Sequence, residues 1–511
     1  MRGGATNLVI IVSDELRYDA LSCAGNRLAR TPNLDRLAER GTRFANASAP
    51  SPICVPARAS LATGLPVHRI GYWDNALAYD GRVPGWGHAL QAAGVRVESI
   101  GKLHYRRAED PTGFGAQHLA LHIASGTGQV WGSVRDPLPA HRGRSPLFDE
   151  LGPGESTYNR FDEAVAACAC DWLAARGREA RSASDGRGPP WVLFVGLVAP
   201  HFPLVVPQRW LDTLARGPIP LPGLLPRDGY AHHPWVARMV AFMDHDAAFA
   251  DDAARRLAIA CYHGLVAFLD AQVGRVLAAI DAAGLADRTR VLFTSDHGDN
   301  LGRRGLWNKC TLYRDASAVP MILAGPDVRA GHVCNTPVSL IDVHDTVLHS
   351  VGLERPAPPS GVERRSLLDV CAAADEPRRA VLSEYHAVGS PSAAFRLSDA
   401  GHAYHHYVGY RPELFDLVAD PGETRDLAAQ PRAPGVDALL AQWEARLAER
   451  LDPVAVDRAA RRDQNALVAA VGGREAALAI GPPGASPAPD VPAPAVPPPP
   501  RPGATRASNG P

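Results

Sequence analysis

Four short apolar runs along the chain each end in a polar cluster. The runs cover residues 7–13, 95–100, 191–198 and 290–295. The polar residues that follow them include Asp14, Lys102, His201 and Asp296. Such runs are typical of strands buried on both faces of a parallel sheet, and ligands bind beyond the carboxyl ends of such strands. The pattern predicts an α/β fold, a mostly parallel sheet flanked by helices, with one composite polar site at its carboxyl edge.

Helical patterns separate the apolar runs. A helix is predicted from Thr31–Pro32 to Arg40 with Gly41 as its stop, a second over residues 158–175, and a long one between Asp251 and Ala283. A polar loop is expected at 176–190. Residues 106–160 show no periodicity, so we expect long loops there that cover the site and select the substrate.

The pattern changes near Arg379 to short alternating segments, at residues 380–386, 394–397, 403–410 and 413–417. They predict a small antiparallel sheet, joined by a helix over 436–451. From about Gly481 the chain is rich in Pro and Ala, as in a disordered or polyproline tail. We therefore expect a catalytic α/β domain at 1–378, a C-terminal α+β subdomain at 379–480 and a tail at 481–511.

Composition and charge narrow the class of protein. The 511 residues are 46% hydrophobic, and 53 basic residues balance 54 acidic ones, so the chain is globular, with no footprint for nucleic acid or an anionic membrane. The first apolar run, residues 8–12, is too short for a signal peptide or a membrane span, which predicts a cytoplasmic protein. Eight cysteines follow neither disulfide nor zinc spacing. The sequence leaves open whether the chain forms a homo-oligomer.

The stretch Ser51–Gly64 is the main candidate for chemistry. Pro56 suits the first turn of a helix and Gly64 its left-handed stop, so Cys54 would lie at the donor-rich start of that helix, which favours an anionic substrate. Two interpretations stand side by side: a nucleophile site, or a buried structural cysteine before an ordinary helix.

Other candidates lie after the apolar runs. Asp14 and Glu15 form an acidic pair suited to a metal ion, and Lys102 and His104, two residues apart on an extended segment, face the same side. His201 lies between two prolines and suits general acid catalysis, although a structural histidine is the alternative. Asn75 is a candidate donor to substrate oxygens.

The chain contains only two lysines, Lys102 and Lys309, among its 53 basic residues. An ammonium is a compact donor that can exchange a proton, whereas a guanidinium is a broad and permanently charged fork. Retention of lysine at these two positions alone indicates a chemical need for it there.

The Cys54-x-Pro56-x-Arg58 spacing followed by Thr63–Gly64 resembles the sulfatase signature. Further segments match in the same order from Asn7 to about Leu427: Gly101-Lys102-x-His104, Pro200–His201, Asp296-His297-Gly298-Asp299, Lys309 and Leu414-Phe415-Asp416-Leu417. The resemblance implies the fold of the alkaline phosphatase superfamily, and the motifs are most similar to choline sulfatases and phosphonate monoester hydrolases.

The resemblance implies residue roles. Cys54 would be oxidised to formylglycine by a formylglycine-generating enzyme, and its hydrate would attack sulfur. A divalent metal ion would be held by Asp14, Glu15, residue 54, Asp296 and His297. Arg58 and Lys102 would support the hydrate, and Lys309 would neutralise sulfate oxygens. His201 would protonate the leaving alcohol and His104 would deprotonate the second hydroxyl.

Two positions depart from many sulfatases, which have Asp in place of Glu15 and Asn in place of His297. Glu15 reaches one methylene further, which leaves its direct ligation open. Imidazole nitrogen at position 297 shifts the preference from calcium toward manganese, so both Ca²⁺ and Mn²⁺ are candidates.

The function expected from this resemblance is hydrolysis of the sulfate ester of a small organic alcohol or phenol. Hydrolysis of a phosphonate monoester or phosphodiester at the same site is the alternative. The same nucleophile, metal ion and lysines would stabilise either tetrahedral anion, the sulfate or the phosphorus-containing one. A third hypothesis is a binding protein without catalytic activity, with an unmodified Cys54 and no need for metal.

Overall fold

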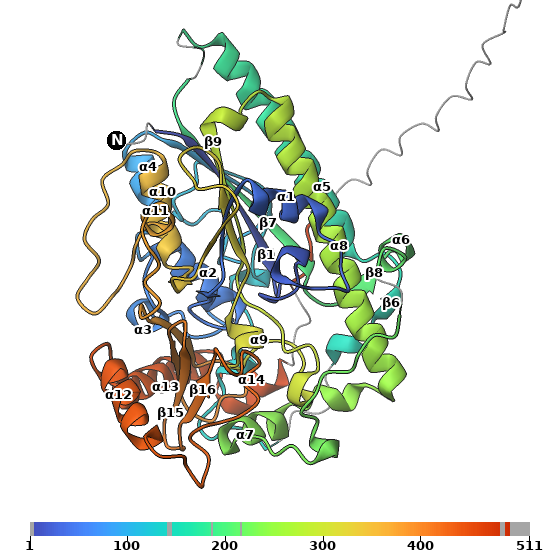
Figure 1. Cartoon of the computed structure of the whole chain (residues 1–511), viewed down its shortest axis with the longest axis vertical. Helices are drawn as coiled ribbons and strands as arrows, with labels where there is room; N and C mark the ends of the chain where they lie inside the picture. Colours follow the sequence, from blue (N-terminus) through green and yellow to red (C-terminus); the bar gives the residue numbers. More distant parts are fainter. Residues whose placement is uncertain are drawn as a thin grey trace, which may run out of the picture.

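The centre of the molecule is an eight-stranded, mostly parallel sheet (Figure 1). The computed structural model describes residues 5–140, 146–184, 186, 188–214, 217–480 and 486–490. In spatial order the strands are β11 (His332–Cys334), β2 (Gly41–Phe44), β10 (Met321–Ala324), β9 (Thr289–Ser295), β1 (Asn7–Asp14), β7 (Trp191–Pro200), β4 (Arg96–Lys102) and β5 (Ala116–Leu121). Only β10 runs antiparallel to its neighbours, β9 and β2. The predicted α/β class is confirmed.

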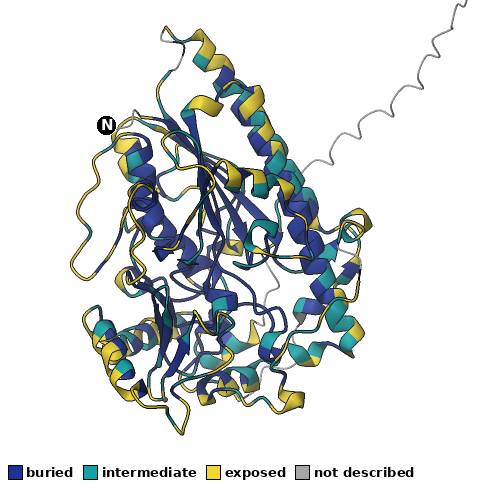
Figure 2. Ribbon diagram, viewed as in Figure 1, coloured by how far each residue is buried: buried dark blue, intermediate teal, exposed yellow. Residues whose placement is uncertain are grey.

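Helices cover both faces of the sheet, so its central strands β1, β7 and β9 are buried throughout (Figure 2). Along β1, Val9 and Ile11 pack on one side with α1 (Pro32–Glu39), α5 (Thr157–Ser182) and α8 (Asp252–Ala282). On the other side of β1, its residues Leu8, Ile10 and Val12 pack with α2 (Cys54–Thr63), α4 (Trp86–Ala92), α10 (Asp342–Ser350) and α11 (Leu367–Ala372). This two-sided burial explains why β1 has an uninterrupted apolar sequence.

All four strands predicted from the apolar runs are present, as β1, β4, β7 and β9. The predicted loop at 176–190 is wrong in its first part, because α5 continues to Ser182. Its Arg, Glu and Ala residues favour helix, and Gly177 lets α5 approach the backbone of Ala283, whose carbonyl oxygen a Cβ would meet at 2.5 Å. Gly41 likewise begins β2 instead of capping α1.

A second, smaller sheet lies beside the first and is purely antiparallel. Its strands are β13 (Val381–Tyr385), β14 (Ala394–Ser398), β15 (His402–Tyr407) and β16 (Glu413–Asp416). The helix α12 (Val436–Ala448) packs on it through Trp443 and Leu447, as predicted. The sequence interpretation missed α13 (Pro453–Ala470), although Asp452 caps two backbone N–H groups at its start and Pro453 fills its first position.

Short elements complete the described chain. The strands β3 (Ala47–Ser48) and β12 (Val338–Ser339) pair, as do β6 (Leu151–Pro153) and β8 (Leu204–Val206). The remaining α-helices are α3 (Val67–Ile70), α6 (Gln208–Leu211), α7 (Pro234–Phe242), α9 (Arg314–Ser317) and α14 (Arg474–Ala479). Single 3₁₀ turns are η1 (Ser22–Ala24), η2 (Ala124–Gly126), η3 (Val130–Ser133), η4 (Pro146–Phe148), η5 (Pro226–Asp228), η6 (Asp246–Ala248), η7 (Ala286–Arg288) and η8 (Arg303–Gly305).

Among the described residues, no helix combines the length and apolarity that crossing a bilayer requires. The tail predicted at 481–511 lies outside the described residues except for 486–490. That short piece is in contact with the candidate site, as described below.

Candidate active site

The carboxyl ends of four strands bring the candidate residues together. Asp14 ends β1 and Lys102 ends β4, while His201 follows the end of β7 and Asp296 follows β9. Cys54 is the first residue of α2, whose C-terminal Gly64 adopts the left-handed conformation at φ 67°. The backbone thus delivers side chains from five distant segments to one edge of the sheet.

Cys54 is 1% exposed, and its surroundings are ionic. Its Sγ lies 3.2 Å from His297 Nε2, 3.4 Å from Lys309 Nζ and 3.7 Å from Asp14 Oδ1. Burial, together with the negative charge of Asp14, raises the pKa of the thiol to about 11. The unmodified thiol is therefore protonated at neutral pH and is a poor thiolate nucleophile. A structural cysteine would pack against apolar groups, which this one does not.

Two cations hold the carboxylates beside Cys54. Arg58 donates from Nε to Asp296 Oδ2 at 2.7 Å and from Nη2 to Asp14 Oδ2 at 3.1 Å, and Lys102 Nζ lies 2.7 Å from the same Asp14 oxygen. Burial acts to raise the pKa of Asp14, but Lys102, His201 and Arg58 together hold that pKa well below its ordinary value. Asp14 is therefore ionised. Because the cations contact Oδ2 of each carboxylate, Oδ1 of Asp14 faces Cys54 and His297. Oδ1 of Asp296 lies 3.6 Å from His297 Nε2 and also accepts the backbone N–H groups of Glu15 and His297.

His297 completes a cluster with the donor set of a metal site. Its Nδ1 donates to the carbonyl oxygen of Gly298 at 3.0 Å, which directs the lone pair of Nε2 toward Cys54. Ligand atoms of Asp14, Cys54, Asp296 and His297 all lie within 4.8 Å of one another. Converging carboxylate oxygens and an imidazole nitrogen oriented by a backbone carbonyl fit a divalent cation.

Glu15 is placed apart from that four-residue cluster. Its Oε2 contacts Lys309 Nζ at 3.0 Å and lies 3.5 Å from His201 Nε2. Burial is the main cause that raises the pKa of Glu15, and Asp299 adds to it. Burial would lower the pKa of Lys309, but Cys54, Glu15 and Asp14 hold it well above its ordinary value. Asp299, which the sequence interpretation did not single out, is part of this buried group.

His104 and His201 flank the same cavity as neutral imidazoles. Burial is the main cause that lowers the pKa of each well below 6.5, with Lys102 adding to the effect at His104 and Lys309 at His201. His104 Nε2 lies 3.0 Å from the hydroxyl of Ser486, and the Tyr158 hydroxyl donates to the carbonyl oxygen of Ser486. A segment read from sequence only as a Pro/Ala-rich tail thus contacts a candidate catalytic base.

Asn75 lines the cavity as expected, and its orientation is fixed. Its Oδ1 accepts a hydrogen bond from the backbone N–H of Val55 at 3.1 Å. The amide oxygen is occupied in this way, so the amide nitrogen is the group that can donate to a ligand.

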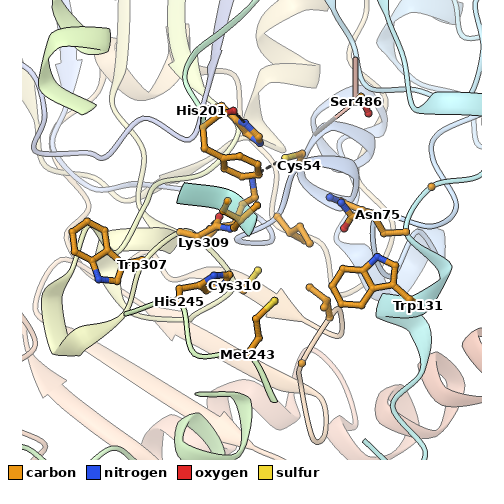
Figure 3. Close-up of a pocket in the computed structure, with 18 of the residues that line it drawn as sticks. Cys54, Asn75, Trp131, His201, Met243, His245, Trp307, Lys309, Cys310 and Ser486 are labelled. Atoms are coloured by element: carbon orange, nitrogen blue, oxygen red, sulfur yellow. Dashed lines mark hydrogen bonds between the residues drawn. The ribbon is translucent and has the colours of Figure 1, made fainter. Parts of the chain in front are cut away.

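A cavity of about 420 Å³ opens above Cys54 (Figure 3). The polar floor of this cavity consists of Cys54, Lys102, His104, His201 and Lys309. Figure 3 shows Trp131 and Met243 across the cavity from His201. Within the segment 106–160, predicted to cover the site, residues 123–125, 127–129 and 131 line the cavity. The strand β5 lies in the same segment, which the sequence suggested was irregular.

Comparison with known proteins agrees with this geometry. A family model described as Sulfatase matches residues 6–353. The chain belongs to the sulfatase family. A choline-sulfatase from Rhizobium meliloti (strain 1021) is 30% identical, with 91% of this chain and 90% of that protein covered. An arylsulfatase K from Danio rerio is 27% identical, with 83% and 80% covered.

Solved structures confirm the fold of this sulfatase. The phosphonate monoester hydrolase of Agrobacterium radiobacter superposes with a TM-score of 0.69 at 22% identity, covering 88% of this chain and 96% of that one. At this level of identity the likeness concerns the fold alone. The identification as a sulfuric ester hydrolase follows from the family.

Proposed function

We propose that this sulfatase hydrolyses the sulfate ester of a small organic alcohol or phenol, with residue 54 as the nucleophile after its oxidation to formylglycine. The observation that carries the proposal is the position of Cys54. Its sulfur lies within 3.7 Å of His297, Lys309 and Asp14, at the floor of the cavity. A formylglycine hydrate at this position would supply one hydroxyl to attack sulfur with release of the alcohol, and a second hydroxyl whose deprotonation would expel sulfate and regenerate the aldehyde.

A divalent metal ion would be held by Asp14, Asp296, His297 and residue 54. Bound there, the ion would polarise a sulfate oxygen as a Lewis acid. The two Oδ1 atoms and His297 Nε2 already converge, as a preorganised site requires. An imidazole among the donors favours Mn²⁺ over Ca²⁺, which prefers oxygen ligands alone. Glu15, paired with Lys309, would orient that lysine and not bind the ion directly.

The other residues of the floor would move protons and hold charge. Lys309 would neutralise sulfate oxygens. Arg58 and Lys102, which both contact Asp14, would support the hydrate at residue 54. His201, a neutral imidazole next to Lys309, would relay a proton to the departing alcohol. His104 would accept the proton of the second hydroxyl, a role that its low pKa permits at neutral pH.

Mass spectrometry of the peptide that contains residue 54 tests the nucleophile. Coexpression with a formylglycine-generating enzyme is expected to give a mass for the aldehyde at position 54, and sulfate release from an aryl sulfate that follows the aldehyde content. A chelator is expected to abolish turnover and Mn²⁺ to restore it better than Ca²⁺. Full turnover by protein with unmodified Cys54 would overturn the proposal.

Aryl phosphonates and aryl phosphodiesters, assayed beside the matching aryl sulfate, test the alternative activity. We expect kcat/KM to be highest for the sulfate. A binding protein without activity would turn over none of these substrates and would show no dependence on metal.

We also propose that the enzyme works in the cytoplasm. All eight cysteines are unpaired in the structure, as expected for a reducing compartment. Fractionation of the producing cells, with activity measured in each compartment, tests this location.

A further inference from the structure

The strand β7 loses its regular pairing just before His201. Up to Gly196 it pairs residue by residue with β1 on one side and with β4 on the other. The next pair with β1 joins Asp14 to Pro200, so β7 has three residues, 197–199, where β1 has one. Extra residues of this kind form a β-bulge, which redirects the chain and is common next to active sites. The bulge at 197–199 therefore determines where the chain leaves the sheet and where His201 lies.

The backbone of this bulge is held by one carboxylate from α5. Asp162 Oδ1 accepts a hydrogen bond from the N–H of Val198, and Asp162 Oδ2 accepts one from the N–H of Ala199, each at 2.8 Å. The carbonyl oxygen of Val198 in turn accepts the N–H of His201 at 3.0 Å. A chain of two hydrogen bonds through Val198 thus connects the carboxylate to the backbone of His201.

A carboxylate at this position is unusual, because its surroundings are otherwise apolar. Asp162 is 1% exposed, and its neighbours Phe161 and Val165 on α5 belong to the apolar core. Burial raises the pKa of Asp162 to about 7, and the N–H groups of Ala199 and Val198 oppose that rise. A buried carboxylate destabilises a fold unless hydrogen bonds offset its lost hydration. The N–H groups of the bulge supply such bonds, so Asp162 and the bulge depend on each other.

The same face of α5 also contacts the side chain of His201. Tyr158 lies four residues before Asp162, which places both on one face of the helix. The Tyr158 ring and the His201 imidazole meet edge to face, with centroids 6.2 Å apart. The imidazole Nδ1 donates to the carbonyl oxygen of Phe202 at 2.7 Å, so Nε2 is the nitrogen that faces the carboxylates of the active site. One helix therefore supports both the backbone and the ring of His201.

We propose that Asp162 is a positioning residue for His201. Its carboxylate ties the bulge to α5 and so holds the imidazole at the cavity floor in the orientation that proton transfer requires. The inference rests on the proposed function, in which His201 relays a proton to the departing alcohol. Asp162 is not part of the described cavity lining, so it acts on the reaction through the residues that it holds.

Asp162→Asn tests this role with little change in side-chain shape. The amide has one acceptor oxygen, and its NH₂ group faces one of the two backbone N–H groups, so two donors oppose each other. The bulge is then expected to shift and to displace His201. Melting temperatures of the wild type and the variant show whether the variant remains folded.

The basicity of the leaving oxygen separates a positioning role from a general effect on the fold. Proton transfer to that oxygen matters more for phenyl sulfate than for 4-nitrophenyl sulfate, whose phenolate is a weaker base. In enzyme that carries formylglycine and metal, we expect Asp162→Asn to reduce kcat/KM at least about tenfold on phenyl sulfate and less than about threefold on 4-nitrophenyl sulfate. An equal loss on both esters would overturn the inference, and so would no loss on either.

Asp270 provides a matched control elsewhere in the molecule. It lies on α8, is 2% exposed, and its carboxylate accepts the backbone N–H groups of Asn33 and Leu34 at the start of α1. Asp270→Asn therefore makes the same chemical change at a second buried carboxylate, one outside the described cavity lining. We expect it to lower the melting temperature and to leave the ratio of kcat/KM for the two esters unchanged. A change in that ratio like that of Asp162→Asn would attribute the effect to lost stability and overturn the inference.

A double variant tests whether Asp162 acts through His201. His201→Ala removes the imidazole, so Asp162→Asn should have little left to disturb in that background. On phenyl sulfate we expect kcat/KM of the double variant to lie within about threefold of that of His201→Ala alone. A further loss as large as the one that Asp162→Asn causes in the wild type would overturn the inference, because the carboxylate would then act by another route.

Asp162→Ser keeps the inference testable if Asp162→Asn does not fold. Its hydroxyl can accept a hydrogen bond from one N–H group without presenting a second donor to the other. The same selective loss on phenyl sulfate is expected, and an equal loss on both esters would again overturn the inference.

The two proposals fail in different ways. If wild-type protein that carries formylglycine and metal cleaves no sulfate ester, the proposed function fails, and the role of Asp162 fails with it. If the wild type cleaves sulfate esters and the Asp162 variants lose activity equally on both, the sulfatase function stands and only the positioning role fails.

Discussion

Two buried ionic clusters in this sulfatase differ in how their charges are arranged. In the small sheet, Arg396 is 3% exposed and pairs with Glu423 Oε1 at 2.9 Å, while Glu423 Oε2 accepts the backbone N–H of Arg314. Each oxygen has a partner, and neither Arg396 nor Glu423 lines the main cavity. At the active site, by contrast, Oδ1 of Asp14 and Nε2 of His297 converge on Cys54 at the cavity floor.

The pKa shifts of the basic groups show the same difference. Burial dominates at Arg396 and lowers its pKa, with Glu423 opposing the change. At Lys309 the effect of burial is outweighed by Cys54, Glu15 and Asp14, which raise its pKa. In the active site, ligand atoms of Asp14, Cys54, Asp296 and His297 converge within 4.8 Å of one another, which suits a bound cation. Buried charge alone is no sign of function, whereas convergent ligand atoms at a cavity floor are.

Replacement of Cys54 gives the largest expected effect on this comparison. Cys54→Ala removes the proposed nucleophile, so sulfate release is expected to fall by at least about 10³-fold with little change in melting temperature. Cys334→Ala, at a buried cysteine on β11, is the matched control. It is expected to keep kcat and to lose about 1 kcal/mol of stability. Activity retained in Cys54→Ala would remove the distinction between the clusters.

Removing Arg396 from its buried pair with Glu423 in the small sheet is expected to change the stability of the protein and not its activity. Arg396→Met leaves the Glu423 carboxylate buried without its cation, and should lower the free energy of unfolding by about 3–5 kcal/mol, measured by denaturant unfolding. The double variant Arg396→Met, Glu423→Gln should recover part of that loss. A fall in kcat of folded Arg396→Met would contradict a purely structural role.

Lys309→Arg tests whether an ammonium, and not only a positive charge, is needed at the cavity floor. The guanidinium is broader and does not give up a proton, so kcat is expected to fall about 10²-fold while the fold is retained. Arg40→Lys, at a side chain that is 54% exposed, should leave kcat unchanged. Near-normal turnover in Lys309→Arg would refute the inference drawn from lysine scarcity.

The smallest expected effect is the pH dependence of a partly buried pair, His68 and Glu384, 2.9 Å apart between α3 and β13. Burial would lower the pKa of His68, but Glu384 raises it above 6.5. Burial would raise the pKa of Glu384, but His68 and His386 lower it to about 2. The His68 contribution to stability is thus fully present below pH 6.5 and is lost as pH rises through the higher pKa of the folded state.

His68→Gln should therefore lower the melting temperature by a few degrees at pH 6, and by less at pH 9, in parallel thermal scans. A difference that grows with pH would show that the pair has the opposite linkage.

Much of the floor of the active site could be predicted from sequence, because each of its residues ends a local pattern. Asp14 follows a continuous apolar strand, Cys54 precedes a proline and a helix, and Lys102 and Lys309 are the only lysines. Such signals need no knowledge of tertiary structure.

The apolar lining of the cavity could not be predicted in the same way. Met243 and Trp131 look like ordinary core residues in the sequence, and only the fold shows that they line a cavity. Ser486 lies in a segment whose composition predicts a tail, and its contact with His104 spans 382 positions. The helix α13 was missed because its polar sequence hides a narrow buried stripe.

Cys54 is buried partly by residues that are synthesised long after it, among them His297. Its contact with His297 spans 243 positions, so at about 5–20 residues per second the nascent chain exposes the thiol for about 12–50 seconds before that histidine is synthesised. The oxidising enzyme proposed above would have access to the side chain during this interval and would lose it once the sheet assembles. Slower translation between these two codons would then let more of the polypeptide mature into active enzyme.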